Sequence, residues 1–471
     1  MTGINRQSTA DGGDEAFTPA LGCVAFALAA GCAIHFNNGY YSRPGLLCLT
    51  IGLALLAASL FLPSRIRKLA AAPGILAWAM AAGIVFEALV LRSRAGIEPL
   101  PVKAILTVAI LGALQLFAPQ RLKIPLLSLA AMAFFYAGVF TINLPDPGID
   151  TLYWQQHASA ALTDGSNPYE VRVTPRYPEA RFYGPGVLSQ NGQLTYGLPY
   201  PPLSLLMVLP AFVFGGDIRW GQLFAIAGAA LLMAMARRGR IAALAAILFL
   251  LTPRVLYVLW NGWTEPLMVL NFSLLMFCAC RWRKALPWSL GLFLSTKQTA
   301  ILALPLLPLL MEGPRPWREL RGILIKAGMV VAAINLPFLF WNVREFTRAV
   351  VLLQFVQPFR TDALSYLVWI YSLTGQRPGT WIAAPVAIVA IALALWKAPR
   401  SPAGFAAGVT LTTTLFFAFS KQAFANYYYF TIATACWAVA SAKAYPFEDQ
   451  AKNPTQTEAW VGQRIASSSS G

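Results

Sequence analysis

Acidic and cationic residues occur where the apolar segments of this chain are interrupted. The longest interruption runs from residue 145 to residue 202 and contains Asp150, while Lys297 and Arg360 stand at later interruptions. A carboxylate can accept the proton of an attacking hydroxyl, and a cation can neutralise a departing phosphate. If the fold brought such residues together, they could move a group from a phosphate carrier to a hydroxyl without a metal ion.

Apolar segments make up most of the chain and must position these residues. The chain has 471 residues, of which 57% are hydrophobic and 12% are charged, whereas a soluble domain is typically about 25% charged. Segments long enough to cross a bilayer begin near Phe17, Pro44, Pro73 and Pro101, and the pattern continues to Ala442. We therefore expect an all-α polytopic membrane protein with about 12 to 14 transmembrane helices.

Basic residues predict the orientation of these helices. Arg65, Arg67 and Lys68 follow the second apolar segment, and Arg121 and Lys123 follow the fourth. Because cytoplasmic loops are rich in Lys and Arg, the N-terminus is expected inside and residues 145–202 outside. Residues 199–236 do not fit this topology, because they resemble two spans. An odd number of spans is needed to carry the chain from the outer loop to Arg237 on the inner side. The sequence leaves open whether one piece lies along the membrane interface or the Arg cluster that follows is misplaced.

The predicted topology divides the chain into five regions. Within the long loop, the residues from Thr151 to Leu162 favour a short helix at the membrane surface, capped by Asp150 or Thr151. The remainder of the loop is rich in Pro, Gly and Tyr, so we expect an ordered but irregular lid. The regions are a cytoplasmic disordered tail (1–16), N-terminal transmembrane helices (17–142), the extracytoplasmic loop (143–198), a transmembrane core with outer donor-binding loops (199–442) and a cytoplasmic tail (443–471).

The same topology gathers several polar residues on the outer side. Charges at the ends of membrane spans are costly unless they face a wet cavity or a partner, so their convergence predicts a site. Asp150 is the candidate base, with Asp146 and His157 nearby in the loop. The candidate substrate-binding residues are Glu265, Lys297, Arg360, Lys421, Asn426 and Tyr427.

Most of these residues have a simpler explanation that the sequence leaves open. Asp150 is also a residue type that caps helices, and Glu265 could stabilise the first turn of a helix. The side chains of Arg360 and Lys421 are long enough to reach lipid headgroups. Tyr427 and the two tyrosines after it fit an aromatic belt at the membrane interface.

A series of short motifs extends from the loop into the following spans. The motifs are Asp150-Thr-Leu-Tyr-Trp, then Ala158, Ala161-Leu162, Gly165 and Asn167-Pro168-Tyr169, then Tyr200-Pro201-Pro202-Leu203, and finally Gly291 to Gln298 (GLFLSTKQ). In this order they resemble the first outer loop of polytopic GT-C glycosyltransferases. The resemblance is greatest to bacterial polyprenyl-phosphate-mannose-dependent mannosyltransferases and covers roughly residues 140 to 300.

This resemblance implies a GT-C-type fold and an enzyme of the cell envelope. Such an enzyme takes mannose or a similar sugar from a polyprenyl phosphate and gives it to a glycan or glycolipid outside the cytoplasm, with inversion and without a cofactor. It also implies that Asp150 is the general base and that Lys297 meets the donor phosphate. The chain departs from the family in having about five spans before the loop, where one is usual, and a long stretch from Glu170 to Leu198. These departures leave the acceptor open.

Other classes of function are weighed against this one. A transporter or lipid flippase would carry charges deep within several spans, and a lipid-linked ligase with a diphosphate donor would favour Arg over Lys near the leaving group. The net charge of +17 does not indicate nucleic acid, because the basic residues fall in short clusters between spans. The six cysteines form no metal-binding or disulfide pattern.

Overall fold

The computed structural model describes residues 18–61, 73–92, 102–177, 182–311 and 316–442. Over these residues the regular secondary structure is helical, and the only β-type pairing is two isolated bridges. The all-α class is therefore confirmed, and several long apolar helices make this a membrane-embedded protein. The predicted tails at 1–16 and 443–471, and the basic cluster at 65–68, lie outside the described residues.

Helices lie on both sides of the long polar segment. Those before it, together with the one that opens it, are α1 (Thr18–His35), η3 (Phe36–Gly39), α2 (Arg43–Phe61), α4 (Pro73–Arg92), α5 (Val102–Leu114), η4 (Gln120–Leu122), α6 (Lys123–Ile142) and α7 (Asp150–Thr163). The next are α8 (Pro202–Gly215), α9 (Arg219–Met235), α10 (Arg240–Leu250), α11 (Val255–Trp260), α12 (Glu265–Arg281), η6 (Arg283–Ala285), α13 (Leu286–Leu294) and η7 (Gln298–Leu310). The last are α14 (Pro316–Trp341), α15 (Val343–Thr347), η8 (Arg348–Leu352), α16 (Leu353–Val356), α17 (Tyr366–Thr374), η9 (Thr380–Ile382), α18 (Ala383–Lys397), α19 (Pro402–Ala418) and α20 (Ala425–Ala440).

The lengths of these helices bear on the number of spans. Among the described residues, five helices are long and apolar enough to cross a bilayer, or six if the bent pair α8–α9 is one span. Other apolar helices are shorter, such as α10 with 11 residues, which extends about 16 Å against the ~30 Å of a hydrocarbon core. The count of 12 to 14 spans therefore stays a prediction.

Hydrogen bonds from basic side chains show which helix ends meet. Lys123 Nζ donates to the Arg237 carbonyl at 2.9 Å, and Arg237 Nε donates to the Ser441 carbonyl at 3.2 Å. Arg281 Nε donates to the Met235 carbonyl at 3.2 Å. These contacts join the ends of α6, α9, α12 and α20, and we call this end of the molecule the basic end.

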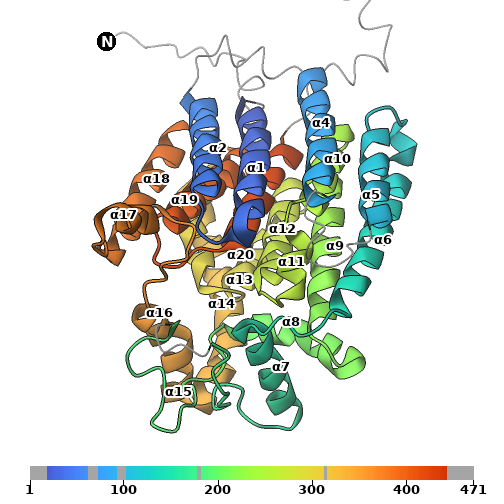
Figure 1. The fold of residues 1–471 in the computed structure, drawn as a ribbon. Coiled ribbons are helices and arrows are strands. Elements are labelled where there is room, and N and C mark those ends of the chain that lie inside the picture. The colour runs from blue at the N-terminus through green and yellow to red at the C-terminus, as the bar shows by residue number, and fades with distance from the viewer. Residues whose placement is uncertain (1–17, 62–72, 93–101, 178–181, 312–315, 443–471) are drawn as a thin grey trace, which may run out of the picture.

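The opposite ends of the same helices meet around α7, and we call this the loop end. Trp260 Nε1 donates to the Pro145 carbonyl at 2.8 Å, and Gln155 Nε2 of α7 donates to the Gly262 carbonyl at 2.8 Å. Figure 1 shows α7, α15 and α16 together at the lower end of the bundle, with the irregular segment between them. Residues that the sequence predicted on one side of the membrane therefore share one end of the molecule.

The pair α8–α9 accounts for the span that did not fit the predicted topology. The two helices are bent by 120° at the break between them. Both ends of α8 lie at the loop end, because Tyr200 just before it lines a cavity there and Gln156 Nε2 of α7 donates to the Gly216 carbonyl just after it. Only α9 connects the loop end to the basic end. Of residues 199–236, α8 thus stays at the loop end. Arg237 lies at the basic end, with the other basic residues, as the predicted topology requires.

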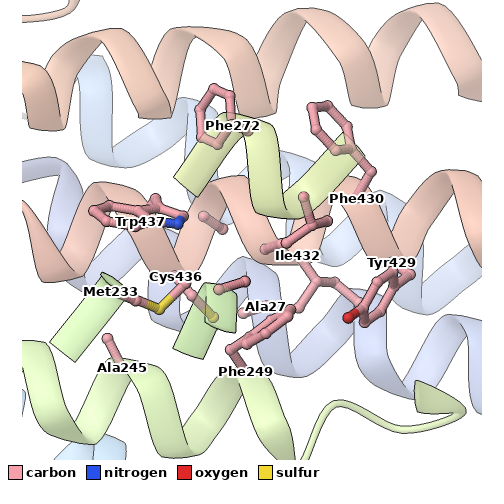
Figure 2. Close-up of a cluster of buried hydrophobic side chains, with 14 of the residues drawn as sticks. Ala27, Met233, Ala245, Phe249, Phe272, Tyr429, Phe430, Ile432, Cys436 and Trp437 are labelled. Atoms are coloured by element: carbon pink, nitrogen blue, oxygen red, sulfur yellow. The ribbon is translucent and has the colours of Figure 1, made fainter. Parts of the chain in front are cut away.

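The main core surrounds α20, in which every residue except Tyr427 is buried. Trp437 Nε1 donates to Ser273 Oγ of α12 at 2.7 Å. Tyr429 packs against Phe249 of α10, with ring centroids 5.6 Å apart, and Figure 2 shows these side chains in the same cluster. Since α20 begins at the loop end, this packing fixes the position of its first turn.

The irregular segment after Tyr169 has a second hydrophobic cluster of its own. Trp154 of α7 stacks on Tyr196 at 5.2 Å between ring centroids, and Tyr169 packs against Phe346 of α15 at 4.8 Å. A salt bridge between Arg172 and Glu345 also joins the segment to α15. The segment is irregular, as expected, and it is packed on both sides rather than lying loosely over the bundle.

Candidate active site

The candidate base stands at the first residue of α7. The N-cap position belongs to Ile149, which makes no side-chain cap hydrogen bond. The prediction that Asp150 or Thr151 would be the cap is therefore wrong. Thr151 Oγ1 instead donates to Asp150 Oδ1 at 3.4 Å, and the Asp150 carboxyl lines a cavity of ≈ 160 Å³ at the loop end.

Five of the seven predicted site residues line this cavity. They come from four parts of the chain: α7, the break between α13 and η7, the segment before α17, and the first turn of α20. The fold therefore brings together predicted site residues that are up to hundreds of positions apart in the chain. The five are Asp150, Lys297, Arg360, Asn426 and Tyr427.

The environment of Asp150 suits a group that accepts a proton. Burial raises the pKa of the Asp150 carboxyl, while hydrogen bonds from Thr151 and the positive charge of Arg360 partly offset this effect. The side chain is half-buried, so it remains open to the cavity. A base whose pKa is closer to the working pH transfers protons more effectively.

Lys297 is held by a partner behind the cavity wall. Its ammonium is paired with Glu265 Oε1, and Asn426 Nδ2 donates to the same oxygen at 2.8 Å. The rings of Tyr200 and Tyr427 lie 5.6 and 5.0 Å from Lys297 Nζ. Glu265 is itself only 2% exposed and does not line the cavity. It therefore positions two cavity residues, which differs from the substrate contact expected for it.

Arg360 brings a second cation to the cavity. Its Nε and Nη2 donate to the two carboxylate oxygens of Asp362 at 2.8 and 2.7 Å. The guanidinium also lies over the rings of Phe182 and Phe424, 4.6 and 4.9 Å from their centroids. Among the described residues these hydrogen bonds do not use the Nη1 group, and the contacts place Arg360 inside the site rather than among lipid headgroups.

Lys421 has a different role from the one expected. Its Nζ donates to the carbonyls of Phe355 and Gln357 at 3.1 and 2.7 Å, and it does not line the cavity. Burial lowers the pKa of the Lys421 ammonium. Because two of its three N–H donors are used by backbone carbonyls, Lys421 secures the segment that carries Gln357, which does line the cavity.

The run of three tyrosines does not form an interfacial belt. Tyr427 lines the cavity. Tyr428 is fully buried and its hydroxyl donates to the Leu364 carbonyl. Tyr429 is fully buried against Phe249. The belt interpretation is therefore wrong, because two of the side chains pack into the core and the third lines the cavity.

Two polar residues of the loop lie outside the cavity. Asp146 pairs with Arg176 at 2.9 Å and accepts a hydrogen bond from the Gly148 amide at 2.9 Å. His157 is exposed, and its Nδ1 lies 2.9 Å from the Tyr153 carbonyl oxygen. Both serve the local structure around α7.

The sequence did not single out several of the aromatic and amide residues of the cavity wall. Tyr40 is the most distant of them, and its signal was the polar, aromatic break Asn-Asn-Gly-Tyr-Tyr between the first two apolar segments. The others could not be distinguished from ordinary loop residues. They include Tyr177, Phe182, Tyr183, Tyr196, Gln354 and Gln357, whereas Tyr200 and Gln298 belong to the motifs quoted above.

This arrangement can support a group transfer between polar substrates. Within the part of the chain that the structure describes, no three His, Cys, Asp or Glu side chains are grouped to hold a metal ion. The cations on the cavity wall are Lys297 and Arg360, and the carboxyl is Asp150. Comparisons of the chain with protein-family models, with curated proteins and with solved structures found no match.

Proposed function

We propose that this protein is a membrane glycosyltransferase of the GT-C type. It would move mannose or a similar sugar from a polyprenyl-phosphate donor to a glycan or glycolipid acceptor at the extracytoplasmic face of the cell membrane. The observation that supports this most is the meeting of Asp150, Lys297 and Arg360 in one cavity. A base and two cations are what the transfer of a sugar from a phosphate requires.

The proposed reaction is a single displacement. Asp150 accepts the proton of the acceptor hydroxyl, and the oxygen attacks the anomeric carbon of the donor sugar. The bond between that carbon and the phosphate oxygen breaks, and the phosphate leaves with the electron pair. Negative charge thus moves from Asp150 to the phosphate, where Arg360 and Lys297 stabilise it. Attack opposite the leaving group inverts the anomeric configuration.

The remaining wall of the cavity favours a sugar as the transferred group. Aromatic rings offer flat faces to the C–H surfaces of a sugar ring, and amide side chains both donate to and accept from its hydroxyls. Tyr196, Tyr200 and Trp263 supply such rings. Gln298 and Gln422 supply amide oxygens, because their Nε2 groups already donate to carbonyl oxygens of the protein. A purely anionic ligand would need more cations and fewer of these groups.

One observation favours the transporter alternative. Glu87 of α4 is fully buried, and neither of its carboxyl oxygens has a hydrogen-bond partner among the described residues. Ionisable groups deep in a membrane often mark a transport pathway. However, none of the residues lining the cavity comes from α4, so Glu87 and the candidate site do not belong to one lined pathway.

The test uses purified protein in liposomes with a panel of labelled polyprenyl-phosphate and polyprenyl-diphosphate sugars. We expect donor-dependent labelling of an added glycan or glycolipid with the monophosphate series. Movement of a labelled lipid across the bilayer without a glycosylated product would contradict the proposal. Transfer from the diphosphate series alone would favour a ligase.

A further inference from the structure

The turn between α1 and α2 reaches the candidate active site. Tyr40 follows η3 and lines the cavity with Asp150 and Arg360. This turn lies far before residues 140–300, where the family resemblance is carried. The N-terminal helices are therefore joined to the site through a residue that the resemblance does not explain.

The backbone of this turn adopts a costly conformation. Asn37, Asn38 and Gly39 have φ values of 51°, 56° and 76°, so three successive residues lie in the left-handed region. Non-glycine residues seldom adopt this region, and strain of this kind persists only where the surroundings hold it in place. A Cβ at Gly39 would lie 2.5 Å from the amide nitrogen of Ala425, which shows how closely the turn approaches the start of α20.

Contacts with two other parts of the site hold the turn. The Tyr41 amide donates to the Asp362 carbonyl at 2.8 Å, and Tyr40 forms an antiparallel bridge with Ala363. The Tyr40 ring packs edge-on against Phe424, with centroids 5.6 Å apart. Asp362 pairs with Arg360, and Phe424 lies under the Arg360 guanidinium. The turn is thus tied to the surroundings of Arg360.

The Tyr40 hydroxyl is placed where it can bind a polar ligand. The charges of Arg360, Asp362 and Asp150 all act on it. Burial raises the pKa of the Tyr40 phenol, so the hydroxyl stays protonated at neutral pH. A phenol in this state can donate one hydrogen bond and accept another.

We propose that the α1–α2 turn is part of the substrate site and that the Tyr40 hydroxyl hydrogen-bonds a hydroxyl of the sugar bound beside Asp150. This inference rests on the proposed function, since it takes the ligand to be a carbohydrate. The sugar belongs either to the donor or to the acceptor, and both have the same chemistry at this point. The N-terminal helices then contribute to substrate selection.

The test compares Tyr40→Phe with Tyr41→Phe. Both changes remove one phenol hydroxyl from the same turn, but the Tyr41 hydroxyl lies 3.4 Å from Ser372 Oγ and does not line the cavity. We expect Tyr40→Phe to raise KM for the donor or for the acceptor roughly three- to tenfold, the loss of one hydrogen bond, with a smaller change in kcat. The substrate whose KM rises identifies the sugar. Unchanged KM for both substrates would overturn the inference.

A binding arm separates this inference from the proposed function. Equilibrium binding of a polyprenyl-phosphate sugar and of a soluble oligosaccharide is measured on wild-type protein and both variants, without turnover. Weaker binding in Tyr40→Phe but not in Tyr41→Phe supports the inference even if no transfer is found. Equal binding by all three proteins, or no binding by any, overturns it. Thermal unfolding of both variants near the wild-type temperature shows that the fold is intact.

Discussion

At the scale of single residues, the cations of the cavity already have acidic partners. Glu265 pairs with Lys297, and Asp362 pairs with Arg360. The charge of each cation is therefore neutralised by its partner before substrate binds. Of the five charged groups, counting the two pairs and Asp150, the Asp150 carboxylate is the one without an ion pair. During the proposed reaction this charge passes to the phosphate, so the total charge within the cavity does not change. The pairs fix where the cations stand.

The buried pair of Glu265 and Lys297 gives a prediction about stability. In Glu265→Gln the ammonium of Lys297, whose side chain is 8% exposed, would be left without a countercharge. Loss of one partner of a buried pair typically costs about 3–5 kcal/mol of unfolding free energy. The double change Glu265→Gln with Lys297→Met should recover much of this loss. Denaturant unfolding of the single and double variants in detergent measures both effects.

A half-exposed pair serves as the control. Asp146→Asn breaks the salt bridge with Arg176, in which the side chains of Asp146 and Arg176 are 54% and 32% exposed, and pairs of this kind contribute about 0–1 kcal/mol. We expect little change in that variant. A Glu265→Gln protein as stable as wild type would show that the buried pair does not hold the site together.

Several of these residues could be assigned to one site from the sequence, because the predicted topology places the outer ends of the spans on the same side of the membrane. Asp150, Lys297 and Arg360 were predicted in this way. Topology could not show where a side chain points once it is there. The Glu265 side chain pairs with Lys297, and the Lys421 ammonium donates to backbone carbonyls. Both contacts are with residues distant in the chain.

At the scale of elements, the irregular segment supplies one wall of the cavity because it is packed between α7 and α16. Its approach to α16 is very close at Gly184. A Cβ there would lie 1.8 Å from the carbonyl oxygen of Val356, so a side chain cannot be accommodated without moving the backbone. Phe182 and Tyr183 precede this glycine and line the cavity.

This approach predicts the effect of Gly184→Ala. The added methyl group should push the segment away from α16, lower the thermal unfolding temperature and raise KM in the transfer assay. Gly328→Ala in α14 is the matched control, because nothing lies within 4 Å of its Cβ position. Alanine within a helix is favoured over glycine by up to about 1 kcal/mol, so the control should be as stable as wild type or more stable. A Gly184→Ala protein that unfolds at the wild-type temperature would contradict the packing described above.

Short elements were predicted with unequal success. The start of α7 follows from the local signals Pro147 and Gly148, whereas the end signal Asn167-Pro168-Tyr169 comes a few residues after Thr163, where the helix ends. The bend after α8 could not be predicted in the same way, because an apolar helix of 14 residues has the same sequence character whether it crosses a bilayer or lies at one end. The position of α8 at the loop end depends on its contacts with α7, which are tertiary contacts and cannot be read from the local sequence.

At the scale of the whole molecule, the basic end and the candidate site are on opposite sides. Arg237 and Arg281 make their contacts at the basic end, whereas Asp150 lies at the loop end. By the positive-inside rule we predict that the loop end lies outside the cytoplasm. The number of spans is harder to predict than this polarity, because Gly and Pro interrupt many apolar stretches and leave short helices.

The proposed orientation is tested by cysteine labelling. Gln190 and Arg238 are both exposed, the first in the irregular segment and the second at the basic end. In intact cells, an impermeant maleimide should label Gln190→Cys, and it should label Arg238→Cys only after the membrane is opened. Wild-type protein controls for the native cysteines. Labelling of both positions from the same side would contradict the orientation.

The most direct test of the central claim is sugar transfer by Asp150→Asn. The amide keeps the size of the side chain but cannot accept the acceptor's proton as a carboxylate does, so we predict a loss of transfer of at least about 100-fold with donor binding retained. Asp146→Asn, in the same loop but outside the cavity, should transfer at the wild-type rate. Turnover by Asp150→Asn at a rate near that of wild type would contradict the assignment of Asp150 as the base.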